Sequence, residues 1–140
     1  MDVSHLLDSL NERQREAVAA PCGSSLVLAG AGSGKTKVLI HRIAWLIQRE
    51  ALSPFSILAV TFTNKAAAEM RGRLEQLLET PARGMWVGTF HGMAHRLLRM
   101  HYQEAKLPQS FQILDADDQV RLLKQLLAAE NLDDKRWPAR

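Results

Sequence analysis

The chain has 140 residues, of which 46% are hydrophobic and 24% charged, so it is long enough for one domain with a hydrophobic core, while its single cysteine, Cys22, excludes an internal disulfide and a cysteine-rich zinc site. No apolar run approaches the roughly 20 residues that span a membrane, and the first residues do not resemble a signal peptide, so we expect a cytoplasmic protein with no membrane partner. The net charge of +3 permits a polyanionic partner, and because residues 1–110 carry 13 Lys and Arg against 9 Asp and Glu, we expect any polyanion site in that part.

The first long helix is predicted to begin after Asn11, a good N-cap residue, and to end at Pro21. Gln14 stands three residues after Asn11, and this spacing favours the return half of a capping box. A glutamine amide near a nucleotide site could instead read an adenine edge, because it offers one donor and one acceptor.

A strand, a glycine-rich loop and a helix are predicted next. The apolar run Leu26–Leu28 predicts the strand, and the apolar spacing from Val38 to Ile47 predicts the helix. The residues between them are Ala29, Gly30, Ala31, Gly32, Ser33, Gly34, Lys35 and Thr36. Glycines let successive backbone N–H groups turn inward on a phosphate chain, and the helix N-terminus adds partial positive charge. The pattern therefore predicts a phosphate-binding P-loop.

Two residues of this loop are placed for chemistry. Lys35 can reach the terminal phosphates, and the Thr36 hydroxyl can ligate the Mg²⁺ that they carry. Ala29 stands where the strict G-x-x-x-x-G-K-[ST] pattern has glycine, a mild departure. The alternative, a glycine-rich turn with a solvated lysine, is disfavoured by the length of the match and its strand-to-helix context.

A second strand is predicted over Ile57–Val60, after the break at Ser53 and Pro54. The chain then enters a helix with Thr63 or Asn64 as N-cap. Phe62 lies in this exit among hydroxyls, an amide and a lysine, a composition typical of single-strand nucleic-acid platforms. The alternative is that its ring points into the core, and the pattern favours neither interpretation.

The helix over 66–78 has one apolar stripe, and Arg71 and Arg73 lie off it, so we predict that both arginines are solvated. The members of the stripe are Ala67, Met70, Leu74, Leu77 and Leu78. A third strand is predicted over Met85–Gly88. Its exit, Thr89–His91, repeats the hydroxyl-plus-aromatic composition of the previous exit. Because the carboxyl ends of parallel strands share one edge, the two exits together indicate a nucleic-acid track.

The rest of the chain is predicted to be helical and to lack a complete catalytic set. His91 and His95 have a metal-ligand spacing, but Gly92 replaces the glutamate of H-E-x-x-H, so zinc is disfavoured. One helix continues through Leu97, Leu98 and Met100 and stops before Pro108, and another follows the N-cap Asp115 to about Glu130. No apolar strand ending in aspartate follows the loop, and three strands make a thin sheet. We therefore expect the front piece of a larger protein.

Four motifs occur in order along the chain, at Leu10–Gln14, Ala29–Thr36, Ala59–Ala67 and Gly88–Gly92. Together they closely resemble the UvrD/Rep/PcrA group of superfamily 1 DNA helicases, and the resemblance covers the whole chain. It implies an α/β fold: a partial RecA-like P-loop NTPase domain, with a parallel sheet flanked by helices, followed by the start of a helical subdomain. On that map residues 1–90 are the N-terminal part of the ATP-binding subdomain 1A, and residues 91–140 begin subdomain 1B.

The resemblance also implies roles for individual residues. Gln14 contacts the adenine base, in place of the capping role that spacing favours. Lys35 and Thr36 are catalytic, and Thr36 holds Mg²⁺ with the nucleotide. The implied ATP-binding residues are Gln14, Ala29, Gly30, Ala31, Gly32, Ser33, Gly34, Lys35, Thr36 and Lys37, where relatives often carry arginine at the last position. The implied single-stranded-DNA contacts are Phe62, Thr63, Asn64, Thr89, Phe90 and His91.

The implied function is the ATP- and single-strand-binding part of an ATP-dependent 3′-to-5′ DNA helicase of repair and replication. The implied partners are single-stranded DNA and single/double-strand junctions, and the resemblance also allows DNA-repair proteins as partners. The acidic Mg²⁺ motif and the arginine finger of the family fall after Arg140, so the chain alone is expected to be inactive. The competing hypotheses are a stand-alone nucleotide-binding regulatory module and a small P-loop kinase, which would need a lid and an acceptor site that the sequence lacks.

Overall fold

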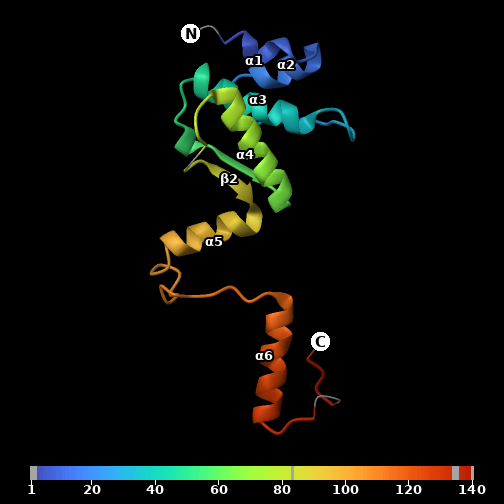
Figure 1. The fold of residues 1–140 in the computed structure, drawn as a ribbon, viewed down its shortest axis with the longest axis vertical. Coiled ribbons are helices and arrows are strands. Elements are labelled where there is room, and N and C mark those ends of the chain that lie inside the picture. Colours follow the sequence, from blue (N-terminus) through green and yellow to red (C-terminus); the bar gives the residue numbers. More distant parts are fainter. Residues whose placement is uncertain (1–2, 83, 134–135, 140) are drawn as a thin grey trace. The chain divides into compact units, whose positions relative to one another are not determined.

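The computed structural model describes residues 3–82, 84–133 and 136–139, and its contacts divide the chain into two compact units, 1–97 and 98–140. The elements of the first unit are α1 (His5–Asp8), α2 (Glu12–Ala19), α3 (Lys35–Gln48), the short 3-10 helix η1 (Pro54–Ser56), β1 (Leu58–Thr61), α4 (Asn64–Leu78) and β2 (Trp86–Thr89). Helix α5 (Phe90–Met100) crosses the division, and α6 (Ala116–Ala129) belongs to the second unit (Figure 1). No described helix is both long and apolar enough to cross a membrane.

The sheet of the described residues has two parallel strands, β1 and β2, paired from Leu58 with Trp86 to Thr61 with Thr89. Helix α4 makes the crossover between them and lies alongside the strands that it connects (Figure 1). Both strands begin one residue later than predicted. The predicted strand at Leu26–Leu28 is wrong: this segment forms no strand, and the side chains of Leu26 and Leu28 are 83% and 85% exposed. A parallel strand needs a neighbouring strand to satisfy its backbone groups, and this segment pairs with none in the described residues.

The main core of the first unit lies between α3, α4 and the two strands, with the α1 segment packed on α3. The predicted apolar stripe of α4 is confirmed, since Ala67, Met70, Leu74 and Leu78 are buried and Leu77 packs against them. The predicted N-caps Asn11, Thr63 and Asp115 are also confirmed: each side chain accepts a hydrogen bond from the backbone N–H three residues on. These local rules hold because a cap bond joins groups that lie close in sequence.

Two arginines bind backbone carbonyls of β2 and of the residues just before it. Arg71 donates to the Val87 carbonyl at 3.1 Å, and Arg96 donates to those of Met85 and Gly84 at 3.4 and 3.3 Å. Arg96 also lies over the Trp86 ring, 4.2 Å from its centroid. The Val87 carbonyl of β2 is therefore bound by a side chain from α4. Arg71 and Arg73 are both exposed, as predicted, and Arg71 in addition binds β2 through this contact.

Candidate functional site

The glycine-rich loop ends where α3 begins, at Lys35, as the sequence predicts for a P-loop helix. Gly32 and Gly34 have φ of 74° and 83°, in the left-handed region that glycine tolerates, and Gly34 is the N-cap of α3. Lys35 Nζ donates to the Gly30 carbonyl at 2.6 Å, and the Ser33 hydroxyl donates to the same oxygen at 2.7 Å. These two bonds close the loop around the Gly30 carbonyl and hold the Lys35 ammonium against the backbone of the loop. Ala29, Gly30, Ala31, Gly32, Ser33, Lys35 and Thr36 are all exposed.

Gln14 joins the start of α2 to this loop. Its backbone N–H donates to the Asn11 side chain at 2.9 Å, and its Oε1 accepts from the Asn11 backbone N–H at 3.1 Å. The capping box favoured by spacing is therefore confirmed. The same amide also donates through Nε2 to the Ser33 carbonyl at 3.1 Å, and a Cβ on Gly34 would lie 2.9 Å from that nitrogen. Gln14 is consequently a cap and a contact of the loop at once.

A second group of predicted residues gathers where the two strands end. The rings of Phe62 and Phe90 lie 5.5 Å apart between centroids, tilted by 48°, and their exposed fractions are 88% and 54%. The core interpretation of Phe62 is therefore wrong, and the ring is presented to solvent. Asn64 and His91 beside the rings are exposed as well.

Two threonines hold the starts of helices beside these rings. Thr63 Oγ1 accepts from the Ala66 N–H at 3.1 Å at the start of α4, and Thr89 Oγ1 accepts from the Gly92 N–H at 3.1 Å at the start of α5. A helix N-terminus carries partial positive charge, which favours phosphate. The ring pair therefore lies next to two sites of anion attraction. Among the described residues, no three His, Cys, Asp or Glu side chains gather where they could hold a metal ion.

Comparison with known proteins bears on this arrangement. A family profile described as the UvrD/REP helicase N-terminal domain matches residues 10–140. The chain belongs to this family. It is 71% identical over all 140 residues to DNA helicase II of Escherichia coli. It is also 63% identical over 142 aligned residues to DNA helicase II of Haemophilus influenzae, and 46% identical over 135 residues to the ATP-dependent DNA helicase PcrA of Staphylococcus epidermidis. These alignments cover 100%, 99% and 96% of the chain but only 19%, 20% and 18% of the relatives, so the chain spans about a fifth of their length.

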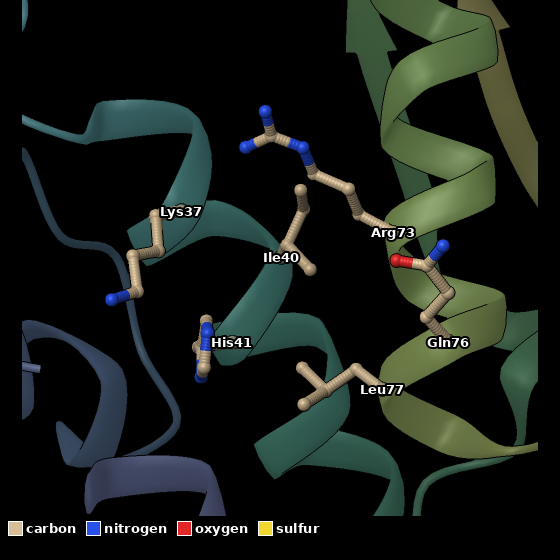
Figure 2. A pocket seen from close by; sticks show the side chains of 6 residues that line it. All are labelled: Lys37, Ile40, His41, Arg73, Gln76 and Leu77. Carbon is tan, nitrogen blue, oxygen red and sulfur yellow. The ribbon is translucent and has the colours of Figure 1, made fainter. Parts of the chain in front are cut away.

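In this helicase-family domain, Lys37 does not face the loop. Its ammonium donates to the Ser9 carbonyl at the end of α1, and its side chain lines a cavity of about 320 Å³ between α3 and α4. Figure 2 shows Lys37 and His41 on α3 and Arg73 and Gln76 on α4, with the apolar Ile40 and Leu77 between them. The ATP contact of Lys37 stays a prediction, and in this arrangement its ammonium is bound to Ser9.

Sequence reasoning missed a set of basic side chains that fix the N-terminal segment of this domain. Buried His41 lies with Nδ1 2.6 Å from the Leu6 carbonyl, and Arg15 donates to the carbonyls of Leu7 and Asp8. Arg42 binds three carbonyls at the end of α2. Such contacts join residues up to 35 positions apart and have no sequence period, so only charge on an otherwise apolar helix face could have indicated them.

Proposed function

We propose that this chain is the N-terminal, ATP- and single-stranded-DNA-binding part of an ATP-dependent 3′-to-5′ DNA helicase of repair and replication in the bacterial cytoplasm. Membership of the helicase family and the ATP-dependent helicase among its relatives support the enzyme class. The observation that carries the DNA role is the pair of exposed rings at the ends of two parallel strands.

In this proposal the loop from Ala29 to Thr36, with Gln14 and Lys37 at its margins, binds ATP. The fit is supported by the left-handed glycines and by Lys35, whose ammonium lies within reach of any group at the loop. Bound Mg²⁺ would neutralise part of the phosphate charge, and the Thr36 hydroxyl at the second position of α3 is the residue to hold it. Phosphate oxygens would replace the Gly30 carbonyl as partners of Lys35. Gln14 would read the base with the amide that now contacts Ser33.

The rings of Phe62 and Phe90 are proposed to stack on bases of a single strand. Stacking on an aromatic face tolerates any base, which suits an enzyme that must move along unrelated sequences. Thr63, Asn64, Thr89 and His91 would contact the phosphates, with help from the N-termini of α4 and α5. Single/double-strand junctions are the substrate that this track would enter, and DNA-repair proteins are its expected partners.

We assign residues 1–90 to the first part of a RecA-like subdomain 1A and residues 91–140 to the start of a helical subdomain 1B, with α5 as the connection. The residues that complete hydrolysis would come from the remaining four-fifths of a protein of the relatives' length. Closure of two such domains on ATP would move the strand past the ring pair. The chain alone then binds without turning over.

A hybrid protein tests this function. In it, residues 1–140 of this chain replace the aligned residues of the E. coli DNA helicase II, with which they share 71% identity. We expect the hybrid to hydrolyse ATP when single-stranded DNA is added and to unwind a duplex with a 3′ tail but not one with a 5′ tail. A folded hybrid that does neither would refute the proposal. Nucleotide binding by the isolated chain as tight as that by the hybrid would favour the stand-alone module.

A further inference from the structure

Arg42 occupies an unusual position for a basic residue, part-buried on α3 beneath the end of α2. Its Nη1 donates to the carbonyls of Val18 and Ala20 at 2.8 and 2.5 Å, and its Nη2 donates to that of Pro21 at 3.1 Å. The last carbonyls of a helix lack partners within the helix, and α2 has no basic residue in its own last turn. A residue 21 to 24 positions away therefore supplies the C-terminal cap of α2.

The apolar contact that holds α2 on α3 is small. Its buried members are Leu10, Val18 and Val38, with three partly buried residues around them. A patch of this size resists separation but constrains the orientation of the helix weakly, because apolar contacts have no direction. The planar, multidentate guanidinium of Arg42 adds direction to the Arg15 contacts with Leu7 and Asp8, since its donors fit one arrangement of the three carbonyls.

The opposite end of α2 carries Gln14, whose amide donates to Ser33 in the glycine-rich loop. Arg42 also holds Ala20 and Pro21, where the chain leaves α2 for the exposed segment that leads into the same loop. One side chain thus fixes both the helix that carries Gln14 and the start of the approach to the loop. Residues 21–33 are exposed throughout, so no core packing supplies an alternative anchor for that approach.

We propose that Arg42 is a positioning residue that sets nucleobase selectivity by acting through Gln14. This inference rests on the proposed ATP site. Without the three carbonyl contacts α2 turns on α3, the Gln14 amide loses its place beside the loop, and the discrimination between an adenine and a guanine edge falls. Arg42 is not one of the proposed nucleotide contacts, so we expect the chemical step to be unaffected.

The experiment uses the hybrid and measures kcat and KM for ATP and for GTP in saturating single-stranded DNA. The variant Arg42→Lys keeps the charge but loses the planar fork that spans the three carbonyls, and Arg42→Gln serves as a second variant if the first fails to fold. We expect KM for ATP to rise roughly fivefold, the effect of one lost hydrogen bond, with kcat within about twofold and with reduced preference for ATP over GTP. Arg13→Lys is the matched control on α2, because Arg13 is exposed and pairs with Glu16.

A cycle with Gln14→Ala separates positioning from a general loss of structure. If Arg42 acts through Gln14, then Arg42→Lys changes selectivity no further in a Gln14→Ala hybrid. Unchanged selectivity in both folded Arg42 variants, an equal effect with and without Gln14, or a fall in kcat with KM unchanged would each overturn the inference. An unmodified hybrid that does not hydrolyse ATP would instead overturn the proposed function.

Discussion

Replacing Phe62 by alanine tests its effect on DNA binding separately from its effect on folding, because the ring is 88% exposed and packs against the ring of Phe90. Removing a buried phenylalanine would cost about 3–5 kcal/mol of folding free energy. Here the loss is limited to one exposed ring pair, worth about 0.5–1.5 kcal/mol. If the ring stacks a base, single-strand affinity should fall by about 1–3 kcal/mol, or about fivefold to 150-fold.

Urea denaturation of the chain measures the first quantity, and fluorescence anisotropy of the hybrid on labelled oligo(dT) and on a mixed-sequence strand measures the second. The loss of affinity should be the same for both strands, since stacking does not read sequence. Phe55→Ala is the matched control, because Phe55 is also exposed but belongs to η1, ahead of the amino end of β1. The stacking account fails if Phe62→Ala leaves affinity within twofold of the unmodified hybrid, or if Phe55→Ala lowers it equally.

Three further outcomes are expected. Lys35→Ala should abolish ATP hydrolysis by the hybrid while nucleotide-free DNA binding stays within about twofold. The reason is that the Lys35 ammonium lies in the glycine-rich loop and not at the ring pair. Equal loss of both activities would contradict this separation. The isolated chain should bind ATP–Mg²⁺ weakly and hydrolyse it more slowly than the hybrid, by a factor on the order of 10³ or larger. Rapid DNA-stimulated hydrolysis by the pure chain would disprove the need for residues from the rest of the hybrid. Gly34→Ala should cost about 1–3 kcal/mol of stability and weaken nucleotide binding, because Gly34 has φ of 83° and its added Cβ would meet Gln14. Gly30→Ala is the control for stability in the same melting measurements, because its added Cβ meets open space and the free energy of unfolding should hardly change.

Local chemistry made much of this fold predictable. The caps at Asn11, Thr63 and Asp115 and the apolar stripe of α4 depend on residues three or four positions apart, and all of them are confirmed. The glycine-rich loop was placed correctly before α3 for the same reason, because the loop pattern and the helix period are adjacent in sequence.

Predictions that depended on distant partners fared worse. The apolar run Leu26–Leu28 has strand composition, but a strand exists only if another strand accepts its hydrogen bonds. Phe62 could not be assigned to core or surface, since its direction depends on how the chain turns after β1. The carbonyl contacts of His41 and Arg42 were invisible for a related reason: a basic residue on a helix gives no indication of which backbone oxygen, tens of residues away, it will meet.

The arginine contacts at β2 oppose growth of the sheet beside that strand. Arg71 occupies the Val87 carbonyl of β2, and Arg96 occupies the Met85 and Gly84 carbonyls just before that strand. An unpaired edge is a template for another strand, and a side chain seated on its carbonyls removes the template. An added strand, from the same polypeptide or from a second copy, that paired through the Val87 carbonyl would have to displace Arg71. Self-association of the isolated chain through β2 should accordingly be made worse by loss of Arg71.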